Sequence, residues 1–286
     1  MSHKEPPDPL SYLTEPFDDI GEFFDEIVAA AKARDEFIAG LAAAGGALLS
    51  AIPGGDAIKA AIRRELNPIV PAPAGASAAK QYWHYQKMLE ARGYTVDPNT
   101  PTVVAMRGMT PAGGGHATTS AASYDDTIVV LNRDAKGQPV VTTLAGSTHP
   151  GQTNASVGGT VGVPDVNGDG KADVGMIHPG EYRLVPHGDH AGAKAWDVRT
   201  PDGSGQIPGV RDTNQDGQFS KAEGDASESR KDVLTGVMIH QGGATTPWSA
   251  GCINLSQNST VYPEFIKAAG GSAQNMKLVV LDANRD

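Results

Sequence analysis

One cysteine occurs in the 286 residues, and it lies in a segment that also holds a histidine. Cys252 stands in the string MIHQGGATTPWSAGCINLS, twelve positions after His240. A thiolate attacks carbonyl carbons well, and a nearby imidazole can take the thiol proton and later protonate the leaving amine. The pair therefore predicts acyl-transfer chemistry on Cys252. The alternative is a small buried core residue, which free cysteines often are.

Residues beside the thiol are suited to hold a reacting carbonyl group. Gly251 allows a tight turn, which could aim backbone N–H groups near Cys252 at a developing oxyanion. Ser249 and Asn254 carry groups that can hydrogen-bond a substrate or fix the loop. We therefore expect the oxyanion and substrate contacts to come from this short segment.

Histidines outside this segment allow a second chemistry. His178, His187 and His190 lie close in sequence, and a zinc hydrolase needs three such ligands and an open position. The string VPHGDHAGAK is typical of a glycine-rich loop, so zinc is the weaker hypothesis. We expect His190 instead to line the substrate cleft near Cys252, and the Trp248 ring to pack beneath the loop.

Two acidic loops have the spacing of calcium ligands. Residues 212–223, DTNQDGQFSKAE, match the EF-hand loop, with Gly217 at the sharp turn. Residues 165–173, DVNGDGKAD, are a shorter variant without a closing glutamate. Ca²⁺ takes about six to eight oxygen ligands, and this spacing wraps oxygens around one point. The expected ligands are Asp212, Asn214, Asp216, Gln218 and Glu223 in the longer loop, and Asp165, Asn167, Asp169, Lys171 and Asp173 in the shorter one.

The flanks of these loops limit the calcium hypothesis. The string PDGSGQIPGV before the longer loop cannot be an entering helix, so a paired-helix calcium sensor is not expected. A turn rich in Asp, Asn and Gly without a metal stays the alternative. Because both loops precede Cys252, we expect bound Ca²⁺ to be structural and to fix the loops of the active-site wall. No organic cofactor is expected.

Composition excludes two classes of partner. The net charge is −10, and residues 1–40 hold ten acidic against three basic residues. The rest of the chain has no basic stripe to neutralise phosphates, so no nucleic-acid partner is expected. The most apolar stretch, residues 37–52, is broken by glycines. A membrane helix needs about 20 apolar residues, so no transmembrane segment is expected.

Hydrophobic periodicity changes along the chain. Residues 1–75 have helical spacing and are expected to be a docking segment or a cap, and a further helix is predicted over residues 78–92. The string PIVPAPAGASAA, residues 68–79, is rich in Pro, Ala and Gly and is expected to be a linker. Short β-branched or apolar runs follow at 102–106, 127–131, 140–144, 236–239 and 277–281. The sequence thus predicts an α+β chain, with a helical N-terminal region over 1–75 and a β-rich catalytic domain with long loops over 76–286.

The segment around the thiol resembles a known family. His240 followed by Ser249-Ala250-Gly251-Cys252 is similar to the signature of the L,D-transpeptidase (YkuD-like) family. The strings VVAMRG, YDDTIVVL, STHPGQ, PGEYRL, HGDHAGAKAW and RDTNQDG resemble the phage- and secretion-associated branch of such peptidoglycan enzymes, so the resemblance covers about residues 100–256. Many members have a histidine directly before Gly-Cys, where this chain has Ala250.

The resemblance implies a function and a place of action. Cys252 would form a thioester acyl-enzyme on a peptidoglycan stem peptide, and His240 would be its general base, oriented by a backbone carbonyl near Gln241 or Gly242. Transpeptidation, exchange and carboxypeptidase activity all stay open. The substrate lies outside the cytoplasm, in the periplasm or cell wall.

Delivery and partners follow from the same expectation. The N-terminus MSHKEPPDPL lacks a signal peptide's apolar run, so we expect export by a specialised secretion machine or release by lysis. A secreted antibacterial effector, or toxin, with an immunity protein fits that route. The alternative function is a calcium-stabilised cell-surface binding module in which Cys252 is structural.

Overall fold

The computed structural model describes residues 64, 67–117, 123–151, 163–258 and 260–284. The chain divides into two compact units, one formed by Met1–Asn67 with Pro73–Ala76 and the other by Pro68–Ala72 with Ser77–Asp286. The helices expected within residues 1–63 lie outside the described residues. The elements below all belong to the second unit.

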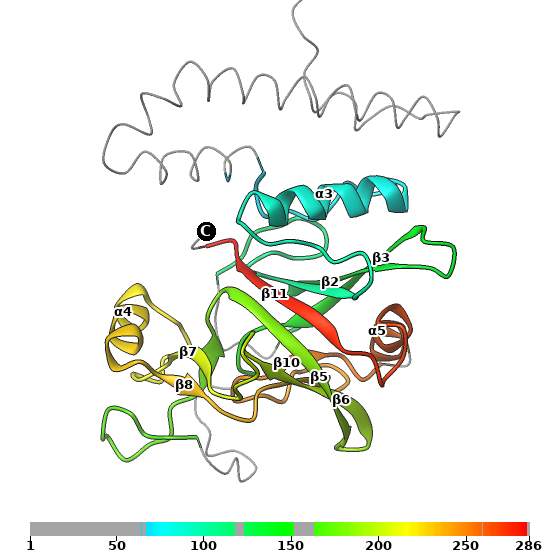
Figure 1. The fold of residues 1–286 in the computed structure, drawn as a ribbon. Coiled ribbons are helices and arrows are strands. Elements are labelled where there is room, and N and C mark those ends of the chain that lie inside the picture. Colours follow the sequence, from blue (N-terminus) through cyan, green and yellow to red (C-terminus); the bar gives the residue numbers. More distant parts are fainter. Residues whose placement is uncertain (1–63, 65–66, 118–122, 152–162, 259, 285–286) are drawn as a thin grey trace, which may run out of the picture. The chain divides into compact units, whose positions relative to one another are not determined.

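Eight strands of this unit form a closed barrel (Figure 1). Their order is β1-β11-β5-β6-β9-β10-β3-β2, and β2 pairs with β1 to close it. The pairs β1/β11 and β9/β10 are parallel, and the other pairs are antiparallel. The strands are β1 (Thr102–Arg107), β2 (Asp126–Arg133), β3 (Pro139–Ser147), β5 (Gly180–His190), β6 (Ala193–Arg199), β9 (Met238–Gln241), β10 (Ile253–Leu255) and β11 (Met276–Asp282).

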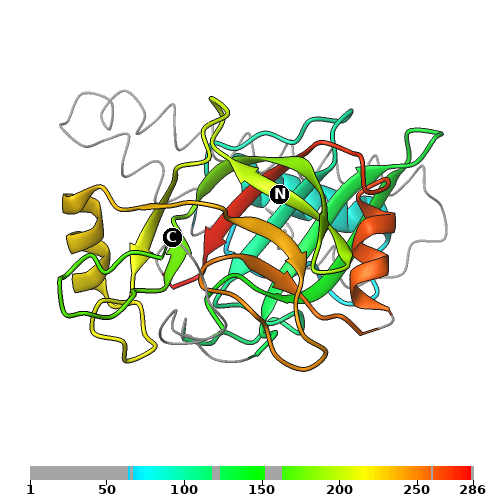
Figure 2. The same cartoon turned by 90° about the horizontal axis from the view of Figure 1, so that it is seen from below.

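A small second sheet and three helices complete the described part. The sheet has the order β4-β7-β8, with β4 (Gly175–Ile177), β7 (Ile207–Arg211) and β8 (Val233–Leu234). The helices are α3 (Ala78–Glu90), α4 (Lys221–Arg230) and α5 (Val261–Ala268). Figures 1 and 2 both place α4 and α5 on opposite sides of the barrel.

Alternation along the strands builds two cores. Val103 and Ala105 of β1 point into the barrel, where they join a buried cluster that includes Trp196 and Phe265. Val104 and Met106 point outward and pack with α3. Because successive side chains of a strand face opposite ways, a strand covered on both faces is apolar throughout. This explains why all six residues of β1 are buried.

The expected α+β class is wrong. Within the described residues, strands form the eight-stranded barrel and the small sheet, whereas helices are limited to the three short ones. Residues 67–77, which were included in the expected helical region or its linker, contain no helix. The class expectation rested on the periodicity of the first 63 residues, which lie outside the described chain. In the part that is described, the β-branched runs decide the class.

Most expected elements of the β-rich part are confirmed. The runs at 102–106, 127–131, 140–144 and 277–281 lie within β1, β2, β3 and β11, and the helix predicted over 78–92 is α3. Ser77 caps α3 by accepting a hydrogen bond from Lys80 N. The run at 236–239 begins two residues before β9, which continues through His240. No helix among the described residues is long and apolar enough to span a bilayer.

The segment expected to be a glycine-rich loop is a β-hairpin. β5 and β6 continue through VPHGDHAGAK and are joined by a two-residue turn. Both turn residues have positive φ, 49° at Ala191 and 84° at Gly192. Such a turn matches the right-handed twist of the paired strands. The loop expectation was therefore wrong, and His187 and His190 lie on a strand.

Candidate active site

Strands β9 and β10 bring the expected nucleophile and base to one face. The strands are parallel neighbours with Ile239 opposite Ile253 and His240 opposite Asn254. Ile239 and Ile253 belong to the barrel core. Because side chains alternate along a strand, His240, Asn254 and the adjoining Cys252 face the other way. The strand pairing thus puts Cys252 and His240 on one face, and their roles as nucleophile and base stay predictions.

A chain of hydrogen bonds fixes the His240 ring. Its Nδ1 lies 2.8 Å from Gln241 O, and its Nε2 lies 3.0 Å from Asn254 Nδ2. Asn254 Oδ1 accepts from Trp248 N at 2.8 Å. Since a carbonyl only accepts, this network assigns the proton to Nδ1 and makes Nε2 the acceptor of the Asn254 amide. The expectation that a backbone carbonyl near Gln241 orients the histidine is confirmed.

Burial sets the charge of both expected catalytic groups. It lowers the pKa of His240 to about 4, and the nearby His190 adds to this lowering, while the Gln241 bond opposes it. Burial also raises the pKa of the Cys252 thiol to about 11. The Cys252 thiol points at Gly236 O, with Sγ and O 3.8 Å apart. At neutral pH the site therefore holds a neutral imidazole and a protonated thiol.

A compact turn precedes the thiol. Ser249 Oγ donates to Cys252 O at 2.8 Å and accepts from Gly251 N at 2.9 Å. Gly251 is needed here, because a Cβ on it would lie 2.8 Å from Gly175 O. The Gly251 N–H is thus engaged by Ser249, and in this geometry it is not aimed at an oxyanion.

His190 lies beside His240, and its expected place in a substrate cleft near Cys252 stays a prediction. Its ring meets the His240 ring edge-on, with centroids 4.8 Å apart. The His187 ring lies on the other side of His190, with the two ring centroids 6.0 Å apart. Its Nδ1 lies 3.0 Å from Asp197 Oδ1. The three rings form a row from a partly exposed strand end to the buried base. Trp248 is 60% exposed, although one edge of its indole lies against Gly243 of the same loop, where a Cβ would be 2.8 Å from Nε1.

The carboxylates of the two acidic loops differ in how they are engaged. Asp212 is fully buried, and its Oδ2 accepts from Gly217 N at 3.0 Å. Burial and the charges of Glu223 and Asp216 raise its pKa to about 6. Glu223 caps α4, accepting from Thr213 N and Ser220 N at 2.9 and 3.0 Å. Burial also raises the pKa of Asp173.

The hydrogen bonds of the other expected ligands are those of a turn rich in Asp, Asn and Gly, which the sequence analysis kept as the alternative to a calcium loop. Asn214 Oδ1 accepts from Asp216 N, and Asp216 Oδ1 accepts from Gln218 N. In the shorter loop Asp165 Oδ2 accepts from Gly170 N at 2.7 Å. Asn167, Asp169 and Lys171, the other expected ligands of this loop, are exposed. The Asn167 side-chain oxygen accepts from Asp169 N, and the Asp169 carboxylate accepts from Lys171 N.

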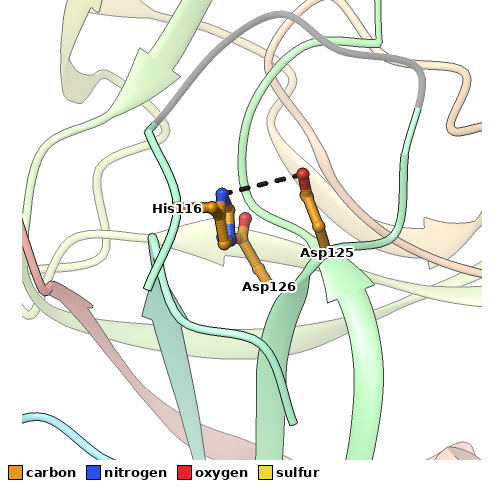
Figure 3. Close-up of side chains that lie close together, drawn as sticks. All are labelled: His116, Asp125 and Asp126. Atoms are coloured by element: carbon orange, nitrogen blue, oxygen red, sulfur yellow. Dashed lines mark ion pairs between the residues drawn. The ribbon is translucent and has the colours of Figure 1, made fainter. Parts of the chain in front are cut away.

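A group of ionisable side chains that the sequence analysis did not single out lies on β2 and its flanks. His116, Asp125 and Asp126 have ligand atoms close enough together to hold a metal ion (Figure 3). Among the described residues, this is the one group of at least three His, Cys, Asp or Glu side chains with that spacing. His178, His187 and His190, the ligands of the zinc hypothesis, do not form such a group within the described residues. The adjacent aspartates in the string YDD, before an apolar run, were the available signal.

Ion pairs account for this group without a metal. His116 lies 3.6 Å from Asp125 and 3.3 Å from Asp126, and the Asp126 bond does most to raise the His116 pKa to about 9. Asp126 also accepts from Gly108 N and Thr148 N, both at 2.8 Å. Burial opposes ionisation of Asp125, but a 3.0 Å bond from His149 helps to bring its pKa down to about 2. The network ties β2 to the ends of β1 and β3.

Comparison with known proteins identifies no relative. No family model, no curated protein and no solved structure matches the chain.

Proposed function

We propose that the protein is a peptidoglycan-modifying cysteine enzyme that forms a thioester with stem peptides on Cys252. The observation that supports the proposal is the common face on which His240 and Asn254 are hydrogen-bonded and to which Cys252, two residues before Asn254, also belongs. The Ser-Ala-Gly-Cys frame and its resemblance to L,D-transpeptidases supply the substrate class. The proposal includes action outside the cytoplasm and delivery as a secreted effector.

The proposed reaction begins from neutral partners. His240 Nε2 exchanges its Asn254 hydrogen bond for the Cys252 thiol and takes the thiol proton as sulfur attacks the stem-peptide carbonyl. The tetrahedral intermediate collapses, the C–N bond breaks, and the imidazolium protonates the leaving amine. An acceptor amine or water then attacks the thioester, which restores the thiol. A neutral imidazole suits the first step because its Nε2 lone pair can accept a proton.

Asn254 and Trp248 are the proposed substrate contacts. The released Asn254 amide can donate to the substrate carbonyl, since its Oδ1 is already held by Trp248 N. The exposed Trp248 ring offers an apolar surface four residues before the thiol. Exposed aromatic rings commonly mark binding surfaces. Both contacts lie in the segment that carries the nucleophile.

Mass spectrometry tests this proposal in two ways. Incubation with purified peptidoglycan should yield new muropeptides, and their masses separate cross-linking, exchange and trimming. Intact-protein spectra should show one acyl adduct per chain, because the chain has one cysteine. Cys252→Ala should lose the adduct and the products while keeping the wild-type circular dichroism spectrum. Unchanged products from Cys252→Ala would show that the assignment is wrong.

A calcium-stabilised surface-binding module is the second candidate. The observation that favours it is the protonated thiol, which donates toward Gly236 O and has no hydrogen bond to His240 among those of the described residues. In that case Cys252 packs the β9/β10 face and performs no chemistry. Retention of wall binding by Cys252→Ala, with no muropeptide change from either protein, would select this candidate.

A further inference from the structure

The two acidic loops meet at one end of the small sheet. The loop 165–173 leads into β4, and the loop 212–223 follows β7. β4 and β7 are antiparallel with Gly175 opposite Arg211, so the two loops lie at the same sheet end. They touch directly, because Asn167 Nδ2 donates to Thr213 O at 2.7 Å. The loops are thus a pair in space.

Each loop buries a carboxylate oxygen that has no hydrogen-bond partner within the described chain. Asp212 is fully buried, and the bond from Gly217 N to Oδ2 turns its carboxylate into its own loop, whereas Oδ1 has no partner. Asp173 is also fully buried; its Oδ2 accepts from Val166 N at 2.8 Å, while its Oδ1 makes no hydrogen bond of good geometry, although the Gln215 side chain approaches the carboxylate. Buried polar atoms are nearly always satisfied in folded proteins. These two oxygens therefore point to a missing ligand.

The charge around these oxygens is negative. Asp165 and Asp169 act on Asp173, and Asp216 and Glu223 act on Asp212. None of the six carboxylates is in an ion pair with a lysine or arginine of the described residues. The neighbouring Arg211 guanidinium donates to two backbone carbonyls, Asp173 O and Val233 O. A divalent cation would supply the missing positive charge.

We propose that each loop binds one Ca²⁺ ion and that the pair of ions holds the turn that carries Cys252. The donors are carboxylate, amide and backbone oxygens, which suit Ca²⁺ better than a transition metal. Asp212 Oδ1 and Asp173 Oδ1 are the buried ligands of the two sites. To bind the ion, the Glu223 carboxylate would give up the hydrogen bond that it now accepts from Thr213 N. The proposal does not depend on the proposed function.

The link to the thiol runs through β4. Gly175, two residues after Asp173, donates its N–H to Ala250 O at 3.0 Å. Its own carbonyl is so close to Gly251 that a Cβ there would lie 2.8 Å away. An ion on Asp173 therefore fixes the start of β4 against the two residues that precede Cys252.

Calorimetry and labelling of the full chain test the proposal. After treatment with chelator, titration with CaCl₂ should show two bound ions per chain and a rise in melting temperature. Asp212→Asn and Asp173→Asn should each lose one ion. Asp225→Asn, which removes an exposed charge on α4, should keep two. Iodoacetamide should label the single cysteine severalfold more slowly in CaCl₂, and Asp173→Asn should abolish that difference.

Each contrary result has a defined meaning. No binding heat and no thermal shift with the wild-type chain would overturn the sites, whatever the variants do. An equal response to MgCl₂ at the same concentration would overturn the assignment to calcium. Two ions bound by Asp212→Asn would refute its role as a ligand. Binding without any change in labelling rate would overturn the link to Cys252.

Discussion

The His240 imidazole is held between an acceptor on one side and a donor on the other. Gln241 O accepts a hydrogen bond from Nδ1–H, and the Asn254 amide donates a hydrogen bond to the Nε2 lone pair. A general base must present a free lone pair to the proton it removes. In the proposed reaction, substrate would therefore have to displace Asn254 before His240 could act on the thiol.

We predict a strong pH dependence for alkylation of Cys252. With its pKa raised to about 11 by burial, the thiol is protonated at neutral pH. Because the thiolate is the reactive form, the rate with iodoacetamide should rise roughly tenfold per pH unit between about pH 7 and 10. Free cysteine in parallel should level off near its ordinary pKa of about 8.5. A plateau below neutral pH would instead indicate a thiolate–imidazolium pair.

Sequence reasoning named candidate site residues that the fold places on one face, but it did not predict their contacts. The His240–Cys252 pair and the backbone orienter could be predicted, because strand alternation and the local string place them on one face. The bond from Asn254 to His240 could not, since it depends on the parallel register of β9 and β10. The exposure of Trp248 likewise depends on what the rest of the fold leaves uncovered.

At the scale of elements, one buried arginine joins the barrel to the small sheet. Arg107, at the end of β1, donates to Thr148 O at 3.1 Å and to Ile177 O at 2.8 Å, and it pairs with Asp282 at 3.5 Å. Thr148 follows β3, Ile177 ends β4 and Asp282 ends β11. A single guanidinium thus holds four element ends together.

Loss of this guanidinium should be strongly destabilising. Arg107→Met leaves the Asp282 charge buried without its cation, and breaking such a pair costs about 3–5 kcal/mol. Urea denaturation should show this loss in the free energy of unfolding. Arg183→Met, an exposed change on β5, should alter stability by no more than about 0.5 kcal/mol. Adding Asp282→Asn to Arg107→Met should recover part of the loss; no recovery would argue against the ion pair.

Individual strands were easier to predict than their arrangement. β-branched and apolar runs marked β1, β2, β3 and β11; β1 is buried on both faces, whereas much of β3 is exposed or half-buried. The β5/β6 hairpin escaped notice because His, Gly and Asp occupy its outer end, where the strands are exposed. Closure of the barrel could not be inferred, since pairing β1 with β11 joins segments at opposite ends of the described chain.

At the scale of the whole molecule, the second unit includes a short segment that precedes α3. Ile69 is buried in the α3 core. Val70 O lies 2.9 Å from His84 Nε2, and Ala72 N donates to the Tyr85 hydroxyl at 3.0 Å. Residues 68–72 therefore belong to the barrel unit, although composition suggested a linker.

Two truncated chains should show whether residues 68–76 stabilise the barrel unit or only link it to the preceding residues. A chain starting at Pro68 should keep the stability of the barrel unit. A chain starting at Ser77 should lose about 3 kcal/mol, from Ile69 burial and two hydrogen bonds. Urea midpoints of the two truncated chains give the comparison directly. Equal midpoints would show that residues 68–76 contribute nothing to the unit.

The pairing of β1 with β11 has a consequence for biosynthesis. Thr102 pairs with Lys277, so a ribosome must release all of residues 102–282 before the barrel can close. Until then β1 and β5 each lack a neighbour, and unpaired strand edges recruit other chains. Contacts of such long sequence separation also form slowly. The interval between the emergence of β1 and the emergence of β11 is therefore when the nascent chain most needs a chaperone.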